Sequence, residues 1–208
     1  MFVAPEPAAG TSAGGPLFVI MILVGAYLLG SFPSAFLMTK VFKKGDIRSI
    51  GSGNVGGMNT ARNVGLSAGI LTGLLDLGKG LLAVYLTKRL APGTYLPMWA
   101  AVACVAGHNW MVFIGFKGGK GLGVTIGSLL LLAPWALLPA AGVVVLGTIL
   151  LKNSYAGTVA GVLSIPISLW FLKQDVNWVL PGVALAAVIV AKHLPDLKRF
   201  ATGKKEVL

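Results

Sequence analysis

The chain contains several apolar runs that are each long enough to cross a lipid bilayer. Of its 208 residues, 56% are hydrophobic and only 11% are charged, and the mean hydropathy is +0.85. A helix of about 20 apolar residues spans the hydrocarbon core of a bilayer. Runs of roughly this length cover residues 17–39, 66–87, 96–114, 155–172 and 177–192. These runs predict an all-α integral membrane protein with a single transmembrane domain over residues 17–208.

The apolar run over residues 122–151 has two interpretations. Thirty residues of helix would extend about 45 Å, which is too long for one span without strong tilt. Pro134 and Pro139 lie in the first two thirds of this run, and a proline removes a hydrogen bond and clashes with the preceding helical turn. One tilted, kinked helix or two shorter helices would both fit.

The positions of the basic residues favour two helices. Two helices give a total of seven, and with the N-terminus outside, 13 of the 17 Lys and Arg residues lie on the cytoplasmic side. These are Lys40, Lys43, Lys44, Arg48, Arg62, Lys117, Lys120, Lys152, Lys192, Lys198, Arg199, Lys204 and Lys205. One helix would instead divide the basic loop residues equally between the two sides. Because cytoplasmic loops carry the excess of positive charge, we expect about seven helices, the N-terminus outside and the C-terminus in the cytoplasm.

The first 16 residues differ in composition from the rest of the chain. They are rich in Pro, Gly and Ala and contain no Lys or Arg, so they lack the basic region of a secretory signal peptide. We expect residues 1–16 to form a flexible N-terminal tail.

The segment GSGNVGG at residues 51–57 is a candidate anion site. Its glycines have the G-x-G-x-x-G spacing of dinucleotide sites, but a membrane helix and a basic loop precede it instead of a β-strand, which excludes that fold. Consecutive glycines can still point their N–H groups into one concavity. The predicted site residues here are Gly51, Ser52, Gly53, Asn54 and Gly56. Arg62 follows eight residues after Asn54 and can grip the same anion, whereas a flexible re-entrant turn is the alternative.

The segment GFKGGKG at residues 115–121 is a second candidate anion site. It is not a nucleotide-binding P-loop, because the residue after Lys120 is a glycine where that motif needs Ser or Thr for magnesium. Glycines and lysines before a helix are nevertheless suited to an anion. The predicted residues are Lys117, Gly118, Gly119, Lys120 and Gly121. Two such sites on one membrane face indicate two anionic ligands, or one ligand with two charged groups.

Four charged or titratable positions lie within or at the ends of apolar runs. Asp76 and Lys79 are one helical turn apart, so they form either a functional charge pair or a link between helices. His108 lies near the end of the third run, and His193 near the end of the last one, with Asp196 three residues later. His, Cys, Asp and Glu show no metal-ligand spacing, so we expect no metal.

Four segments together resemble a known bacterial family. They are GSGNVGGMNTAR at 51–62, LDLGKG at 75–80, GHNWMVFIGFKGGKG at 107–121 and HLPDLKRFATG at 193–203. In order and spacing, the chain from about residue 27 to 206 resembles the membrane-integral, PlsY-type glycerol-3-phosphate acyltransferases, which depend on acyl phosphate.

The resemblance implies an enzyme that moves a fatty acyl group from acyl phosphate to the 1-hydroxyl of glycerol 3-phosphate. The products would be lysophosphatidic acid and phosphate, in phospholipid biosynthesis. It also implies a multi-pass protein of the bacterial inner membrane with a cytoplasmic active site. Apart from the resemblance, we expect no cofactor, metal or nucleic acid, and a monomer. The implied catalytic residues are Ser52, Asn54, Arg62, Lys120 and His193. The glycines of GFKGGKG would form the phosphate loop, with Asp196 beside it.

Some positions depart from the family pattern. Met58 stands where the family has a Thr, and Val124 stands in place of another Thr. Asp196 replaces an Asn and brings a carboxylate to where a phosphate would approach. A transporter or binding protein for anionic or phosphorylated ligands is the alternative function, because it would use the same basic loops and membrane charges.

Overall fold

The computed structural model describes residues 14–43 and 45–202, and the regular structure within them is helical. The α-helices are α1 (Pro16–Gly30), α2 (Ser34–Lys43), α3 (Gly57–Asn63), α4 (Leu66–Leu90), α5 (Leu96–Asn109), α6 (Leu122–Leu132), α7 (Leu137–Leu151), α8 (Ser154–Lys173) and α9 (Val176–Ala201). Short 3-10 helices are η1 (Ile47–Ser49), η2 (Val112–Ile114) and η3 (Pro134–Ala136). The predicted tail lies mostly outside the described residues, as do Lys44, Lys204 and Lys205.

Within the described residues, six stretches are long and apolar enough to cross a membrane. The first is Pro16–Lys43, which contains both α1 and α2, and the others contain α4, α5, α7, α8 and α9. Helix α6 is apolar but has only 11 residues, or about 16 Å of helix. The all-helical membrane fold is therefore confirmed, but the predicted seventh helix is too short to be a full span by itself.

The ambiguous run over residues 122–151 forms two helices, as the charge distribution predicted. Helix α6 ends at Leu132 and α7 begins at Leu137, with η3 between them. Pro134 is the first residue of η3, where its lack of an N–H and its ring stop the preceding helix. Pro139 lies in the first turn of α7, where a missing N–H breaks no helical hydrogen bond.

The first predicted span, residues 17–39, lies within the membrane-spanning stretch Pro16–Lys43, but it is not one continuous helix. Helix α1 ends at Gly30, and α2 begins at Ser34. Pro33 explains the break, because a proline disfavours helical geometry in the residue before it. At this break the carbonyl groups of Gly30 and Phe32 accept hydrogen bonds from the side chain of Lys79.

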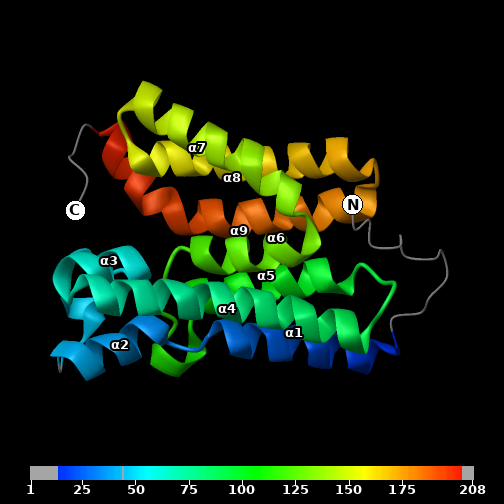
Figure 1. Ribbon diagram of the computed structural model, residues 1–208, viewed down its shortest axis with the longest axis horizontal. Coiled ribbons are helices and arrows are strands. Elements are labelled where there is room, and N and C mark those ends of the chain that lie inside the picture. The colour runs from blue at the N-terminus through cyan, green and yellow to red at the C-terminus, as the bar shows by residue number, and fades with distance from the viewer. Residues whose placement is uncertain (1–13, 44, 203–208) are drawn as a thin grey trace.

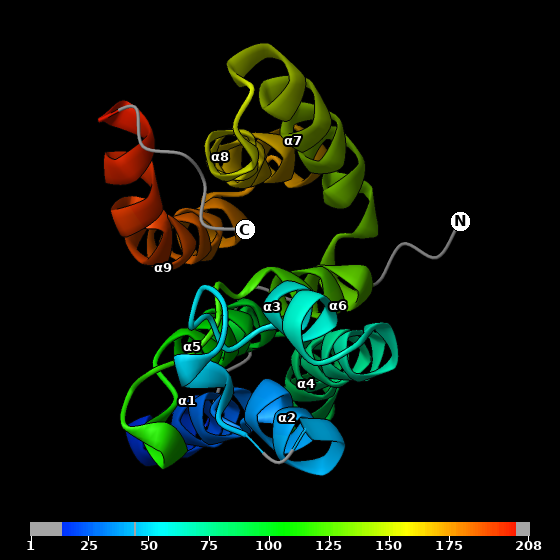
Figure 2. The same ribbon diagram turned by 90° about the vertical axis from the view of Figure 1, so that its left-hand side faces the viewer.

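The helices form two groups that meet along α5 and α9. Figure 2 shows α1 to α6 gathered on one side and α7 to α9 on the other. Cys104 and Val105 of α5 share a buried cluster with Leu185 and Ile189 of α9. In Figure 1, α1 begins at the right-hand end of the bundle, whereas α2, α3 and the end of α9 lie at the left-hand end. Which of these ends faces the cytoplasm stays a prediction.

Helices α4 and α6 approach closely through glycines. A β-carbon added at Gly80 would collide with the backbone carbonyl of Val124, and one added at Gly127 would collide with the carbonyl of Leu77. Because lipid gives no hydrophobic force between helices, close backbone packing is a main source of their association. This contact fixes the start of α6 against α4.

We expect Gly80→Ala to lower the stability of the protein by about 1–3 kcal/mol, because the added methyl overpacks the α4–α6 contact. Gly78→Ala is the matched control, since Gly78 lies on the same helix with open space around its α-carbon. Thermal unfolding of both variants in the same detergent measures the difference. Equal unfolding midpoints would contradict the close α4–α6 contact.

Candidate active site

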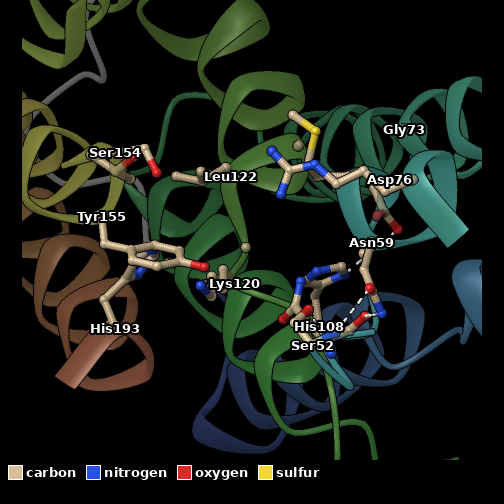
Figure 3. Close-up of a pocket in the computed structure, with 18 residues that line it drawn as sticks. Ser52, Asn59, Gly73, Asp76, His108, Lys120, Leu122, Ser154, Tyr155 and His193 are labelled. Atoms are coloured by element: carbon tan, nitrogen blue, oxygen red, sulfur yellow. Dashed lines mark hydrogen bonds and ion pairs between the residues drawn. The ribbon is translucent and has the colours of Figure 1, made fainter. Parts of the chain in front are cut away.

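A cavity of about 420 Å³ opens at the end of the bundle where α3 lies. It brings together most of the predicted site residues: Ser52, Asn54, Gly56, Arg62, Asp76, His108, Lys120, Gly121 and His193 all line it. Figure 3 shows Ser154, Tyr155 and His193 on one side of the cavity and Ser52, Asn59, Asp76 and His108 on the other, with Lys120 and Leu122 between them. The two helix groups therefore each supply one wall.

The predicted glycine-rich segment at residues 51–57 is shaped by a side chain that the sequence analysis did not single out. Asn59 is buried, and its amide nitrogen donates to the carbonyls of Ile50 and Asn54, each at 3.0 Å. Its side-chain oxygen accepts the N–H of Ser52 at 3.2 Å. The signal was present, because Asn59 lies two residues after the glycine-rich segment and an asparagine can bond several backbone groups at once.

The predicted anion nest at this segment is only partly available to a ligand. Gly51 and Gly53 adopt positive φ angles of 57° and 70°, which glycine tolerates better than other residues. However, the N–H of Gly53 donates to the carbonyl of Ile50, and that of Gly56 donates to the carbonyl of Asn54. These two donors already stabilise the loop, and Gly51 and Gly53 lie outside the cavity lining.

The GFKGGKG segment packs tightly against the end of α5. The N–H of Gly119 donates to the carbonyl of His108 at 3.0 Å, and a β-carbon at Gly118 or Gly119 would collide with His108. Small residues are thus required here by packing. Lys117 is exposed and, like Gly118 and Gly119, lies outside the cavity lining.

The cavity receives the N-terminus of α6. Gly121 caps this helix with φ 82° and no side-chain cap, and Gly121, Leu122 and Gly123 all line the cavity. The first N–H groups of a helix have no partner within the helix, and the helix dipole is positive at this end. The start of α6 therefore favours an anion in the cavity.

The two cationic side chains of the cavity differ in their surroundings. Arg62 is exposed and makes no hydrogen bond or ion pair with the residues that the structure describes. Lys120 Nζ lies 2.7 Å from Asp196 Oδ2 and 3.7 Å from the centroid of the Tyr155 ring. Asp196, which was predicted beside the phosphate, contacts Lys120 from outside the cavity lining.

His193 is oriented by its own helix. The side chain is 1% exposed, and its Nδ1 lies 2.8 Å from the carbonyl oxygen of Ile189. Because a carbonyl oxygen can only accept, Nδ1 carries the proton and donates it. In the neutral ring, Nε2 is then left as a hydrogen-bond acceptor on a residue that lines the cavity.

Asp76 and Lys79 form a buried ion pair beneath the cavity, with 2.9 Å between Nζ and Oδ1. Ser34 Oγ donates to the same carboxylate at 2.7 Å. Lys79 Nζ also lies 3.2 Å from His108 Nδ1. Because an ammonium group can only donate, Nδ1 of neutral His108 accepts, and its Nε2 carries the proton. Lys79 itself lies outside the cavity lining.

Arg48 links the segments that precede the two glycine-rich loops. Its Nη1 donates to the carbonyl of Ile114 at 3.0 Å, and its Nη2 lies 2.6 Å from Asp46 Oδ2. The hydrogen bonds from Arg48 hold the pKa of Asp46 below its usual value, so the carboxylate stays charged at neutral pH.

Comparisons with known proteins agree with this architecture. The sequence profile described as glycerol-3-phosphate acyltransferase matches residues 20–203. A glycerol-3-phosphate acyltransferase from Desulforamulus reducens is 36% identical over 88% of this chain and 92% of its own length. The chain belongs to the glycerol-3-phosphate acyltransferase family.

Other members of this family support the same relationship. Glycerol-3-phosphate acyltransferase 1 from Moorella thermoacetica is 37% identical over 84% of this chain and 91% of its own length. Two crystal structures of PlsY (YgiH), an integral membrane glycerol 3-phosphate acyltransferase, share its fold with 28% identity, covering 91% of this chain and 95% of theirs. The TM-score is 0.81 for the glycerol 3-phosphate form and 0.79 for the lysophosphatidic acid form. The chain is thus a multi-pass integral membrane protein of this family.

Helix α8 supplies a part of the site that was not predicted from the sequence. Ser154, Tyr155 and Thr158 line the cavity, and all three lie in the first turns of α8. The polar segment NSY at residues 153–155 lies where one apolar run ends and the next begins, directly after Lys152, which was predicted to be cytoplasmic. This interruption on the predicted face of the site was the available signal.

His, Cys, Asp and Glu side chains form no group of three that could hold a metal ion within residues 14–43 and 45–202. The expectation that the enzyme needs no metal or cofactor stays a prediction, because it concerns the reaction and not only the arrangement of the side chains.

We expect Asn59→Ala to loosen the loop over residues 50–56, because three backbone groups lose their hydrogen-bond partners at a cost of about 1–3 kcal/mol each when buried. Hydrogen exchange followed by mass spectrometry should show faster exchange in this loop. Asn63→Ala is the control, since the Asn63 amide donates its hydrogen bonds to Asn59 and to no backbone group of this loop. Unchanged exchange in Asn59→Ala would contradict the organising role.

Proposed function

We propose that the protein transfers a fatty acyl group from acyl phosphate to the 1-hydroxyl of glycerol 3-phosphate. The reaction would take place at the cytoplasmic face of the bacterial inner membrane and release lysophosphatidic acid and phosphate. The observation that carries the proposal is that Arg62, Lys120 and the N-terminus of α6 line one and the same cavity. This cavity offers donors and positive charge for phosphate, and related proteins are described as glycerol-3-phosphate acyltransferases.

Acyl phosphate is a mixed anhydride and is already activated. The glycerol hydroxyl oxygen attacks the carbonyl carbon, the new ester C–O bond forms, and the C–O bond to phosphate breaks. The leaving phosphate takes the bonding electrons, and the hydroxyl proton must go to a base. The protein therefore mainly has to hold two phosphates, align the hydroxyl with the carbonyl and stabilise the developing oxyanion.

Each wall of the cavity has a proposed task. Arg62 and Lys120 bind the phosphate groups, and Ser52 and Asn54 add polar contacts to the acceptor. His108 offers its Nε2 proton as a donor, because Lys79 occupies Nδ1. Met58 and Leu122 line the same cavity, and they give an apolar surface to a donor that carries a hydrocarbon chain.

We assign the proton of the attacking hydroxyl to the departing phosphate. Phosphate leaves with unprotonated oxygens next to the new ester, and one of them can take the proton, so the transfer needs no further group. His193 is the alternative acceptor, because its Nε2 is unprotonated when Nδ1 donates to Ile189. His108 is a poor base in the described arrangement, since its Nε2 carries the proton.

The function is tested with purified protein, acyl phosphate and labelled glycerol 3-phosphate in detergent or liposomes. Formation of labelled lysophosphatidic acid supports the proposal. Uptake of label into liposomes without product would support the alternative, a transporter for anionic ligands. Acyl transfer from acyl-coenzyme A, but not from acyl phosphate, would contradict the proposed donor.

We expect Arg62→Ala to lower kcat/KM at least about 100-fold, because the unpaired guanidinium is replaced where a phosphate binds. Arg89→Ala is the matched control, because Arg89 lies in the last turn of α4, at the opposite end of the bundle from the cavity. The control should keep near-normal activity. Near-normal activity of Arg62→Ala in correctly folded protein would contradict the assignment.

We expect His193→Asn to lower kcat by less than about 100-fold, since a general base contributes about 100- to 10,000-fold and we assign that role to the departing phosphate. Asparagine keeps a side-chain donor near the position of Nδ1. Steady-state kinetics, with the unfolding midpoint measured in parallel, provide the test. A larger loss of kcat at an unchanged midpoint would make His193 the proton acceptor.

A further inference from the structure

Asp196 forms an ion pair with Lys120, which is one of the two cationic side chains that line the cavity. Its Oδ2 lies 2.7 Å from Lys120 Nζ, and the two side chains are only 17% and 20% exposed. The other carboxylate near the cavity, Asp76, is already matched by Lys79 at 2.9 Å and Ser34 at 2.7 Å. Asp196 is therefore the carboxylate that offsets the charge available to a bound phosphate.

The Lys120 ammonium group is held between two helices. Asp196 contacts it from α9, and the ring of Tyr155 contacts it from α8, with 3.7 Å to the centroid. Lys120 and Tyr155 line the cavity, whereas Asp196 does not. The carboxylate thus lies behind the lysine, where it can weaken the attraction for an anion without touching that anion.

Lys192 does not take over the pairing of Asp196. Its Nζ donates to the carbonyl of Asn109 at 2.7 Å and lies 5.6 Å from the centroid of the Trp110 ring. It also lies outside the cavity lining. An ionised carboxylate has no donor to offer a phosphate, so the effect of Asp196 on a phosphate bound at Lys120 is repulsive.

We propose that Asp196 lowers the affinity of the cavity for phosphate by sharing the charge of Lys120. This inference rests on the proposed function, in which a phosphate group binds at Lys120 and phosphate leaves as a product. A lysine has three donors, so it can hold Asp196 and a phosphate together. Asp196 then sets how tightly phosphate-bearing substrate and product are held. In contrast, a carboxylate that only positioned Lys120 would strengthen phosphate binding.

Asp196→Asn tests the sign of this effect. The amide keeps the shape and an acceptor oxygen for Lys120 but removes the negative charge. We expect the dissociation constant for inorganic phosphate, measured by calorimetry in detergent, to fall about three- to tenfold. The KM for glycerol 3-phosphate should fall in parallel, and inhibition by inorganic phosphate should become stronger. Asp196→Ala, which also lacks the acceptor, should shift phosphate binding in the same direction if Asp196→Asn does not fold.

Asp175→Asn is the matched control for the change in net charge. Asp175 caps the other end of α9, and it accepts a hydrogen bond from Tyr95 at 2.5 Å. At 1.5 Å per residue, about 31 Å of helix separate it from Asp196. We expect this control to leave the affinity for phosphate unchanged.

The possible results separate the inference from the proposed function. An unchanged or weaker affinity for phosphate in Asp196→Asn would overturn the inference and make Asp196 a positioning residue for Lys120. An equal gain in Asp175→Asn would also overturn it, because the effect would then follow net charge. If the wild type binds phosphate but forms no lysophosphatidic acid, the proposed reaction fails, and the binding comparison still tests Asp196. Failure of wild type and variants alike to bind phosphate would overturn both.

Discussion

The cavity depends on the contacts that the buried ammonium group of Lys79 makes with its neighbours. A charge inside a membrane protein needs close partners, because hydrocarbon cannot solvate it. Asp76 supplies the opposite charge at 2.9 Å, and the carbonyls of Gly30 and Phe32 accept hydrogen bonds from Lys79 at 3.2 and 2.9 Å. Neither carbonyl takes part in the helical hydrogen bonds of α1 or α2, because the first span breaks before Pro33. The Phe32 carbonyl also accepts the N–H of Ser34 at 3.0 Å. The break therefore does not weaken the bundle, since it provides the acceptors that allow α1, α4 and His108 of α5 to meet beneath the cavity.

The glycine-rich segments show how packing and binding share the same residues. The glycines of these segments were expected to let the backbone N–H groups surround an anion. In the structure, Gly118 and Gly119 are required where the loop lies against His108, and the N–H groups of Gly53 and Gly56 stabilise their own loop. The start of α6 also lines the cavity, and the first N–H groups of a helix have no partner within the helix. The glycines of the loops therefore serve mainly in packing and in positioning Lys120 and the N-terminus of α6. A glycine pattern in the sequence does not by itself tell which N–H groups are available to a ligand.

The sequence was informative where the constraint was local or followed from the membrane. Apolar length located the spans, Pro134 explained the division of the run over residues 122–151, and basic residues indicated which loops share a face. The break at Pro33 was missed because the total apolar length of residues 17–39 suggested one span, although the sequence GSFPS at residues 30–34 marks the break. Ser154, Tyr155 and Asn59 were also missed, since their importance comes from contacts between segments about 100 residues apart or from several backbone bonds made by one amide. The pairing of Lys120 with Asp196 joins the loop before α6 to α9, and hydrophobic periodicity does not predict such a contact between distant segments.

The two cations of the cavity suit a reaction in which phosphate is both carried in and released. Only interactions that are stronger in the transition state than in the bound ground state accelerate the chemical step. Arg62 makes no ion pair within the described residues and can give its full charge to a ligand, whereas Lys120 already shares its charge with Asp196. Two unpaired cations and a helix N-terminus would hold product phosphate as tightly as substrate, and release would then limit turnover. In the proposed reaction, pairing one cation internally weakens ground-state binding at that position, while the ammonium group remains in place for the charge that develops during transfer.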